Sequence, residues 1–484
     1  MKADYDKKWD EATVKLRVEM KGWRDGHPKA TFREIEAEVE RGLSELRAQM
    51  LGDMATASEA SEGIDEAGKR VVCPQCGATI HRHGHRTRWL KGRHDAEVEL
   101  TRRYLTCPEC GHGFSPLDNE LGLCANQQLT PWMEECLVRL GVKESFGQAA
   151  EEMAFHHQVT VSKEQARQHT EEAGEVYVQL QESAEAHKIF KPEPAAERLM
   201  MSVDACKVLT TTGEWRDVKT VAIAEVGPGG KAYKSSYFSR KSEYHRFAEQ
   251  AQIEIWRRQI KSCREVCAIN DGADWIPPVV TAFRPDATRI LDFYHAAEHV
   301  AAAGASVFGE GTADFHAWFH RQCHELKEGN PDTVLADLAI LATTHPQQAE
   351  TINATQGYLT KRRDSICYVE FKKAGWPIGS GSGEAAHKVV IQARMKRAGM
   401  RWGEDNVDRM AAARNLICNN RWQDDWPLIV AARQSPSSST TSVQPVNKPS
   451  LLPPGFILRP AVPWRNQPVG KAKLQSQSAP PEKC

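Results

Sequence analysis

Residues 199–209, LMMSVDACKVL, form an apolar run that holds a single acid, and the chain changes here from a helical to an extended pattern. The β-branched and other apolar residues predict a buried strand that contains Asp204. A carboxylate on a buried strand is costly unless a hydrogen-bonding partner or a metal ion compensates its charge. We therefore expect Asp204 to lie beside a cation.

Four further strands are predicted after this segment. Residues 215–227 and 231–239 stay extended, and helical stretches then alternate with two short strands, the first of which ends at Asp271. The order is βββαβαβ, an α/β pattern in which crossover helices make the later strands parallel. Side chains at such strand ends gather at one edge of the sheet, so Asp204 and Asp271 are expected to be neighbours. Asp274 is an alternative to Asp271.

A second stretch with an acid, residues 376–402, has the sequence WPIGSGSGEAAHKVVIQARMKRAGMRW. The glycine and serine run at 379–383 excludes regular structure, and a helix is expected from Glu384 with Ser382 as its N-cap. The helical period predicts two faces. The face with the acid contains Glu384, His387, Lys388 and Ile391. The small-residue face, expected to pack on the sheet, contains Ala386, Val389 and Ala393. Glu384 could serve chemistry or only complement the helix dipole.

Cations without intervening acids follow the predicted helix start. They are Lys388, Arg394, Lys396, Arg397 and Arg401. Such a stretch is suited to contacts with DNA phosphates, and solvated surface charge is the alternative.

Two CPxCG motifs, at residues 73–77 and 107–111, indicate a metal site. Each motif puts two thiolates on a tight turn, and two such turns supply a tetrahedral four-sulfur site, which holds a fold together and has no open position for catalysis. We predict a zinc ribbon over residues 71–118 with structural zinc, and redox dithiols are the alternative. The predicted ligands are Cys73, Cys76, Cys107 and Cys110. The nearby histidines His81, His83, His85 and His112 could substitute as ligands.

The segment between the two cysteine motifs is basic. Its seven cations are Arg82, Arg86, Arg88, Lys91, Arg93, Arg102 and Arg103, against three acids. This bias favours a phosphate backbone as the partner of the predicted short strands.

Residues 119–196 are predicted to be helical and to resemble a helix-turn-helix. A helix from residue 146, a short turn and a second helix capped at Ser162 follow one another. The second helix would direct Lys163, Gln165, Arg167 and Gln168 outward. DNA reading through Lys163 and Arg167 is one interpretation, and a plain helical packing module is the other.

The remaining segments set the domain boundaries. Residues 1–70 are predicted to be a helical region followed by a linker, and a catalytic domain is expected over 197–433 with a helical insertion at about 293–375. The tail at 434–484 has too little apolar content to fold, so we expect it to be disordered. The N-terminal helical region carries an apolar stripe that needs a partner surface: Phe32, Ile35, Val39, Leu43, Leu46 and Met50.

The composition favours a cytoplasmic protein. The formal net charge is −1, no run of 18 apolar residues occurs, and the N-terminal sequence lacks the apolar stretch of a signal peptide. We therefore expect no membrane partner, and any binding to nucleic acid must come from the local basic segments.

The acid-bearing motifs resemble those of a known enzyme family. Asp204 in MSVDACK, Asp271 in AINDGADW and Glu384 in GSGSGEAAHK, on the order βββαβαβ with a long helical insertion, resemble the DDE transposases of ribonuclease H-like fold. More narrowly, DFYHAAEH together with RMKRAGMRW is similar to bacterial insertion-sequence transposases of the ISKra type, which are related to the Mutator-like group. The resemblance covers about residues 30 to 425.

The resemblance implies an activity and its cofactors. Asp204, Asp271 and Glu384 would hold two Mg²⁺ ions, with Mn²⁺ as a possible substitute, for strand cleavage and strand joining at the ends of an insertion sequence. Asp292 and His295 match the C/D-x-x-H signature of such enzymes. The partners would be double-stranded DNA and further copies of the chain, because paired DNA ends favour a homodimer or a larger oligomer.

Three other functions fit parts of the sequence. The motif H-x-x-E-H at residues 295–299 matches inverted zinc proteases but leaves the three acids unexplained. A non-catalytic DNA-binding regulator would need only the N-terminal half of the chain. A ribonuclease H-like nuclease would cut DNA without joining it.

Overall fold

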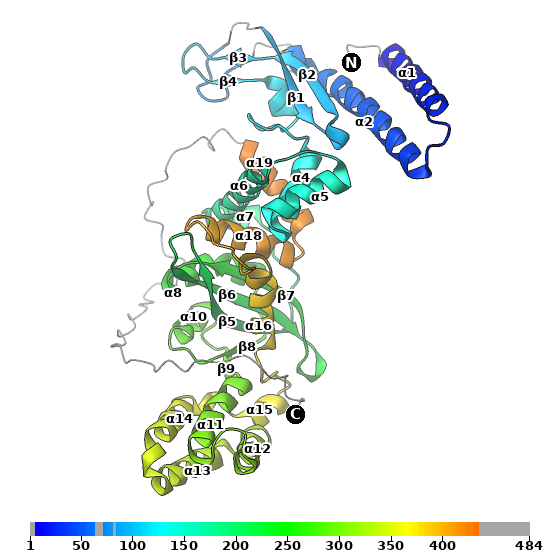
Figure 1. The fold of residues 1–484 in the computed structure, drawn as a ribbon. Helices are drawn as coiled ribbons and strands as arrows, with labels where there is room; N and C mark the ends of the chain where they lie inside the picture. The colour runs from blue at the N-terminus through cyan, green and yellow to red at the C-terminus, as the bar shows by residue number, and fades with distance from the viewer. Residues whose placement is uncertain (1–4, 63–70, 81–83, 435–484) are drawn as a thin grey trace.

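A five-stranded mixed sheet lies at the centre of the computed structural model, which describes residues 5–62, 71–80 and 84–434 (Figure 1). The strands are β5 (Arg198–Leu209), β6 (Trp215–Val226), β7 (Ala232–Arg240), β8 (Glu265–Asn270) and β9 (Thr288–Leu291). Their spatial order is β7-β6-β5-β8-β9, with antiparallel pairing among β5, β6 and β7 and parallel pairing of β5, β8 and β9. The chain is therefore a mixed α/β protein.

Two short helices, α8 (Tyr244–Gln250) and α9 (Gln252–Arg257), connect β7 to β8, and α10 (Ile276–Phe283) connects β8 to β9. The helical stretch expected between the third and fourth strands is thus two helices. Successive residues of β5 pack into different cores, because neighbouring side chains of a strand point to opposite faces of the sheet. Val203 lies in the large core with Phe247 and Phe283, whereas Met200 lies in a second core with the helices of the insertion.

The insertion between β9 and residue 376 is a group of helices with its own core. They are α11 (Phe293–Phe308), α12 (Ala313–Glu328), α13 (Pro331–Thr344), α14 (Ala349–Lys361) and α15 (Tyr368–Lys373). Figure 1 shows them together at the end of the sheet beyond β9. Trp318 is 6% exposed and packs in this core.

The chain returns from the insertion into the segment that contains the last predicted acid. It forms α16 (Gly381–Ala386), a π-helical turn η6 (His387–Gln392), α17 (Ala393–Met395), α18 (Asn406–Cys418) and α19 (Trp422–Gln434). The backbone at Ser382 and Glu384 is described, but their side chains lie outside the described part of the structure. α16 begins before the predicted start at Glu384.

The N-terminal part is a helical pair packed on a β-hairpin. It contains α1 (Tyr5–Gly26), α2 (Phe32–Thr56), β1 (His85–Lys91), β2 (Glu97–Arg103), the short strands β3 (Leu105–Thr106) and β4 (Gly113–Phe114), and α3 (Pro116–Glu120). The residues of α2 that meet the hairpin are small: an added Cβ at Gly52 would lie 2.6 Å from the Glu99 carbonyl. The predicted apolar stripe is not the buried face, because Phe32 and Leu43 are 80% and 47% exposed.

Helices α4 (Pro131–Lys143), α5 (Phe146–His157), α6 (Lys163–Glu182) and α7 (Ala186–Ile189) join this part to the sheet. Capping boxes at Ser145 and Ser162 start α5 and α6, which confirms the predicted helix, turn and helix. α6 lies across α18 so closely that a Cβ on Gly174 would collide with the backbone of Arg409. The hairpin touches the turn between α5 and α6, where Asp95 accepts hydrogen bonds from Thr160.

Two predicted segments fall outside what the structure describes. They are residues 63–70 of the predicted linker and, apart from Gln434 at the end of α19, the predicted disordered tail. Of the helices in the described ranges, none combines the length and the apolar character needed to cross a membrane.

We predict that Gly174→Ala lowers the stability of the chain, because the new methyl group would force α6 and α18 apart. Overpacking of this kind costs about 1–3 kcal/mol. The matched control is Gly147→Ala, where nothing lies within 4 Å of the added Cβ. This control should be stabilised by a few tenths of a kcal/mol, up to about 1 kcal/mol. Thermal unfolding of the full chain measures both effects, and equal unfolding temperatures for the two variants would contradict the prediction.

Candidate functional site

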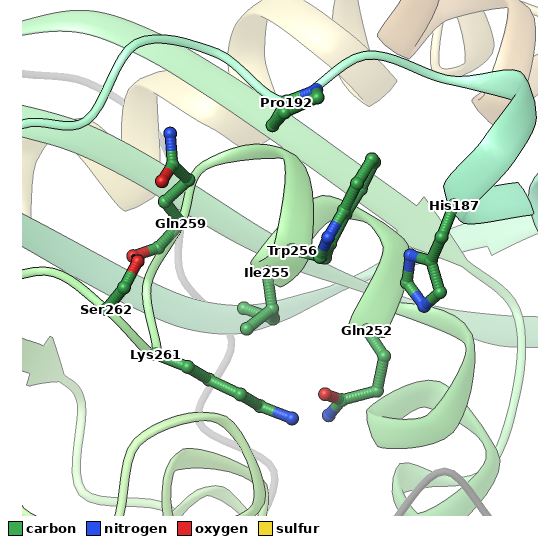
Figure 2. Close-up of a pocket in the computed structure, with 8 residues that line it drawn as sticks. All are labelled: His187, Pro192, Gln252, Ile255, Trp256, Gln259, Lys261 and Ser262. Carbon is green, nitrogen blue, oxygen red and sulfur yellow. The ribbon is translucent and has the colours of Figure 1, made fainter.

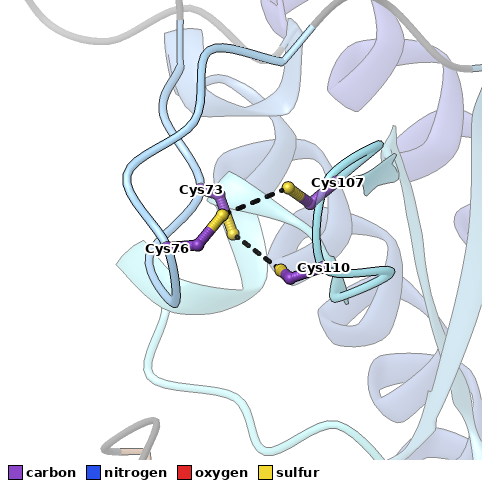
Figure 3. Close-up of side chains that lie close together, drawn as sticks. All are labelled: Cys73, Cys76, Cys107 and Cys110. Carbon is purple, nitrogen blue, oxygen red and sulfur yellow. Dashed lines mark hydrogen bonds between the residues drawn. The ribbon is translucent and has the colours of Figure 1, made fainter.

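Four thiols from the two CPxCG motifs come together in the N-terminal part (Figure 3). The Sγ atoms of Cys73 and Cys110 are 3.6 Å apart, and those of Cys76 and Cys107 are 3.4 Å apart. A tetrahedral zinc site with Zn–S bonds of about 2.3 Å requires an edge of roughly 3.8 Å between sulfurs, so the four thiols could hold a structural zinc ion.

The backbone around these thiols has the same geometry in both motifs. Gly77 and Gly111 have φ angles of 75° and 70°, in the left-handed region that glycine adopts without strain. Their N–H groups donate to the carbonyls of Cys73 and Cys107, each at 2.9 Å. Each motif is thus a tight turn that aims two sulfurs at one point, which fits a zinc ribbon.

The histidines near the cysteines have other contacts where the structure describes them. His112 stacks on Phe114, and His85 lies 3.7 Å from a carboxylate oxygen of Glu62. His81 and His83 lie outside the described residues. The ligand atoms of the four thiols all lie within 4.8 Å of one another. Within the described part of the chain, no other group of three or more metal-binding side chains meets this distance.

The basic segment between the motifs is only partly a surface for phosphates. Arg88 and Arg102 both donate to the carboxylate of Asp118, and their side chains are 9% and 7% exposed. Arg86 stacks over the ring of Tyr104 at 4.3 Å. Arg88 and Arg102 are therefore not available to contact a phosphate backbone. These two hold the hairpin to α3.

The parallel pairing of β5 and β8 brings the two predicted acids of the sheet to one edge. The ladder runs from Arg198 opposite Glu265 to Met201 opposite Ala268, and the N–H of Val203 donates to Oδ1 of Asn270 at 2.7 Å. One residue further along each strand come Asp204 and Asp271. Their charges interact: burial raises the pKa of Asp204, and the Asp271 carboxylate raises it further. Asp204 and Asp271 are neighbours, as the strand order predicted.

These two acids lack a strong cation among the described residues. The ionisable base that lies close to Asp204 is the His387 ring, whose Nδ1 is 3.8 Å from the carboxylate. Burial lowers the pKa of His387 despite the nearby acid, so this ring is mostly neutral at pH 7. One oxygen of Asp271 accepts a hydrogen bond from the N–H of Ala273. Among the described residues, no group of three metal-binding side chains that includes these acids has its ligand atoms within 4.8 Å of one another.

Asp274, the alternative to Asp271, is already paired. Its Oδ1 lies 2.6 Å from Nζ of Lys361 and 3.3 Å from Nη2 of Arg362, both at the end of α14. The side chain of Asp274 therefore fastens the insertion to the end of β8, whereas the carboxylate of Asp271 has no ion-pair partner in the described part of the chain.

Asp292, from the predicted C/D-x-x-H motif, is a buried connector. It is 1% exposed and directly follows β9. Its Oδ1 accepts hydrogen bonds from the N–H groups of Tyr294 at 2.7 Å and His295 at 3.2 Å, which caps α11. Its Oδ2 accepts from the N–H of Ser380 in the glycine-rich loop. His295 is more accessible and pairs with Glu298 at 3.2 Å.

The glycine-rich loop brings the backbone of residue 384 close to β5. Gly383 lies so near Ser202 of β5 that a Cβ would collide with the serine side chain. His387, one turn after residue 384, reaches Asp204 from the same helix. The side chain of Glu384 itself lies outside the described part, so its approach to the two aspartates stays a prediction.

The predicted faces of this helix are wrong beyond Ala386. His387, Val390 and Ile391 are buried, whereas Val389, expected to pack on the sheet, is 45% exposed. The reason is the π-helical turn, whose i→i+5 hydrogen bonds shift each residue away from its place on a regular α-helix. Such turns often occur at functional sites.

Arg394 and Arg397 do not face outward as expected. Arg394 is 1% exposed, its Nε donates to the Gly141 carbonyl at 3.0 Å, and its guanidinium lies 4.7 Å from the Phe146 ring centroid. Burial, together with neighbouring arginines, lowers the pKa of Arg394 to about 10. Arg397 donates to the Lys143 carbonyl and pairs with a carboxylate at the end of α4. The prediction that Arg394 contacts DNA phosphates is wrong, because the guanidinium is inside the protein.

The other predicted DNA contacts lie at the surface. Lys163 is exposed in the first turn of α6, and Arg167 is half-buried between Glu164 and Glu171. Further exposed cations are Lys388, Lys396 and Arg401. Lys396 lies 6.0 Å over the ring of Trp215.

A hollow of about 530 Å³ opens beside Asp271. Its lining comes from the end of β8 and from the insertion: Asp271, Asp274, Trp275, His295, His299, Tyr358 and Arg362. The Tyr358 hydroxyl donates to the Asp271 carbonyl at 2.6 Å, and Arg362 donates to the Gly272 carbonyl. The insertion therefore both fastens the Asp271 loop and forms one wall of the acid site. Sequence reasoning singled out Asp271, Asp274 and His295 separately but did not predict that they meet Tyr358 and Arg362, because these residues are scattered over about 90 positions of the chain.

A second hollow, of about 440 Å³, lies behind the start of β8 (Figure 2). Trp256 and His187 stand side by side there with ring centroids 4.7 Å apart, and Lys261 extends along the opening. It lies at the other end of β8 from Asp271, so it is separate from the acid site.

We predict that Cys73→Ser removes most of the bound zinc from the purified chain, because three thiolates hold the ion much more weakly than four. Metal analysis should find about one zinc per wild-type chain and clearly less in the variant. Cys136→Ser is the control, since this half-buried thiol on α4 is not part of the cluster. Unchanged zinc content in Cys73→Ser would rule out the site.

We also predict that Asp292→Asn loosens the glycine-rich loop. The amide can still cap α11 through its oxygen, but its NH₂ group would face the Ser380 N–H. Losing a hydrogen bond to a buried charged acceptor costs about 1.5–3 kcal/mol. Hydrogen exchange of residues 378–383 should therefore be at least about 10-fold faster, with little change inside α11. Asp314→Asn, an exposed acid in the first turn of α12, is the control, and unchanged exchange in the loop would contradict the prediction.

Comparison with models of known protein families and with curated protein sequences gives no match to this chain. Its function must be inferred from the geometry of the acid site and its surroundings.

Proposed function

We propose that this chain is a DNA transposase that catalyses metal-dependent phosphoryl transfer, namely strand cleavage and strand joining at the ends of an insertion sequence. The observation that carries the proposal is the pair formed by Asp204, which lies on β5 just beyond its pairing with β8, and Asp271, which directly follows the end of β8. These carboxylates repel each other and have no lysine or arginine partner in the described part of the chain. Such a pair is stable at neutral pH when a cation binds between the two groups.

The chemistry of the pair favours Mg²⁺ or Mn²⁺. Both are hard cations that prefer carboxylate and phosphate oxygens. Asp204 and Asp271 would hold the ions together with Glu384, whose backbone lies in α16. Two such ions stabilise the attacking and leaving oxygens of an in-line displacement at phosphorus. Asp271 is the better second ligand than Asp274, because Lys361 and Arg362 already neutralise Asp274.

The sheet supports a ribonuclease H-like catalytic fold. Three antiparallel strands are followed by two parallel ones, in the order β7-β6-β5-β8-β9. Ligands of such sheets bind at the carboxyl ends of the parallel strands, near the point where the order reverses. The strand β5 is at that point, and Asp204 is near its middle, where the pairing with β8 ends.

The N-terminal half supports DNA as the substrate. It carries a thiol cluster that could hold zinc, and the helices α5 and α6, which follow one another after a short turn as a helix-turn-helix requires. Lys163 is exposed at the start of α6, where recognition helices meet the major groove. The predicted contacts of Lys388, Lys396 and Arg401 with phosphates remain compatible with their exposed positions.

The test is cleavage of the DNA that flanks the coding sequence by the purified full-length chain. With Mg²⁺ or Mn²⁺, wild type should nick this DNA and join the ends to a target, and chelation of the metal should stop both reactions. Asp204→Ala, Asp271→Ala and Glu384→Ala should each lower cleavage at least about 100-fold, as expected for loss of a metal ligand. DNA affinity of these variants should stay within about threefold, because phosphate contacts supply most of it.

Asp274→Asn and Asp217→Asn are the controls. Asp274 distinguishes the two possible second ligands, and Asp217 is an exposed acid on β6 that pairs with Lys207. Both variants should keep most of the cleavage activity. Cleavage without joining would indicate a nuclease, and full activity of Asp204→Ala would reject the proposed site.

A further inference from the structure

We propose that His387 is a positioning residue, which holds the carboxylate of Asp204 in the orientation in which it binds a divalent metal ion. The inference rests on the proposed function, because it takes Asp204 as a metal ligand. It adds to the acid site a residue that touches neither the metal nor the DNA and acts through the carboxylate alone.

The His387 ring lies behind the Asp204 carboxylate, on the protein side. The side chain of His387 is 5% exposed and that of Asp204 is 38% exposed, and Nδ1 lies 3.8 Å from Oδ2 of the acid. The ring also contacts the backbone of Asp204. Asp204 can thus receive an ion from the solvent side, whereas the ring is shielded from it. His387 is therefore not a metal ligand itself.

The two nitrogens of the ring have different surroundings. Nε2 is buried and has no hydrogen-bond partner among the described residues. Nδ1 faces a carboxylate oxygen, which is an acceptor. The ring proton is best placed on Nδ1, because the carboxylate attracts an N–H at this position, whereas an N–H at Nε2 would stay unpaired.

A role in packing alone does not explain a histidine at this position. A buried nitrogen without a partner costs about 1–3 kcal/mol, which an apolar side chain of similar size would avoid. Val390 and Ile391 of the same turn are such side chains and are fully buried. The polar ring is thus kept at a cost, and the group that it faces is Asp204.

With the proton on Nδ1, each oxygen of Asp204 faces an N–H group. Oδ1 accepts a hydrogen bond from the N–H of Ala205 at 2.6 Å, and Oδ2 faces the ring. The 3.8 Å contact is longer than a hydrogen bond, and a small rotation of the carboxylate would make it one. In metal sites the ligating carboxylates are themselves hydrogen-bonded, and loss of such a partner typically lowers metal affinity by about 10- to 100-fold.

The backbone places the ring beside the acid by packing along one face of β5. Residues 202, 204 and 206 of this strand point to the same side of the sheet. The segment 383–391 follows them in the same order: Gly383 lies against Ser202, His387 faces Asp204, and Ile391 shares an apolar core with Cys206. The contacts on both sides of His387 therefore fix where its ring stands relative to the carboxylate.

The test is binding of Mn²⁺ to the full-length chain without DNA, followed by the electron paramagnetic resonance signal of the free ion. The chain is saturated with zinc beforehand so that its thiols are occupied, and binding that Asp204→Ala abolishes is assigned to the acid site. His387→Leu, which has a similar volume but no donor, should weaken this binding about 10- to 100-fold. His387→Asn, whose amide N–H can replace the Nδ1 N–H, should bind within about threefold of wild type.

The control is His316→Leu, which changes an exposed histidine on α12 and should bind Mn²⁺ as wild type does. Unchanged affinity in His387→Leu would overturn the inference. Equal weakening in His387→Leu and His387→Asn would also overturn it, because the ring would then matter for packing and not as a donor. Both results leave the proposed function standing. Absence of Asp204-dependent binding in wild type would instead reject the proposed metal site, and the inference with it.

Discussion

The carboxylate of Asp292 is the interaction on which the arrangement of the acid site depends. The chain leaves the sheet at this residue, runs through five helices and comes back at Ile378, whose carbonyl accepts a hydrogen bond from the N–H of Phe293 at 2.9 Å. Closing so long a loop has an entropic cost, which grows with its length. One buried charge offsets part of that cost, since it caps α11 at the start of the loop and binds Ser380 at its end.

This connection sets where residue 384 can go. Glycines at 379, 381 and 383 would otherwise leave the backbone free. Asp292 binds the N–H of Ser380 at the start of the loop, and Gly383 contacts Ser202 at its end. These two contacts fix the position of the loop backbone at both ends. Arg198 adds a further clamp, because it stacks on Trp376 at 3.9 Å and donates to the Ala374 carbonyl. The start of α16 is therefore positioned by β5 and β9 rather than by its own sequence.

The features that the sequence predicted well depend on neighbours along the chain. The order of the strands along the chain, the adjacency of Asp204 and Asp271, the cap at Ser162 and the approach of the four cysteines all follow from local spacing combined with simple rules of pairing. The class of fold and half of the candidate site were thus within reach of sequence reasoning.

The features that it missed depend on contacts between distant segments. A run of arginines predicts positive charge. It does not predict that the carbonyl of Gly141, 253 residues away, accepts a hydrogen bond from Arg394. Asp118 captures Arg88 and Arg102 in the same way. The π-helical turn could not be read from the sequence either, because its residues have no pattern that distinguishes it from a regular helix. His299 and Tyr358 meet only after α11 and α14 have packed.

The arginines that were expected to face DNA join the two halves of the molecule instead. The last turn of α4 leaves carbonyl groups without helical partners, as every helix does. Three of them accept hydrogen bonds from guanidinium groups of the C-terminal segment: Gly141 from Arg394, Val142 from Arg414 and Lys143 from Arg397. Cations at a helix C-terminus are also favoured by the helix dipole.

Two of these arginines follow the π-helical turn that carries His387 to Asp204. The end of α4, next to the helices α5 and α6 that are proposed to meet DNA, is therefore joined to the segment after α16 by charge-assisted hydrogen bonds, of which those from Arg394 and Arg414 are buried. Breaking such contacts would leave buried guanidinium groups without hydrogen-bond partners, which costs several kcal/mol. A movement of α4 on DNA must accordingly move the segment after residue 384 as well, so the geometry of the acid site cannot be independent of how α4 to α6 are held.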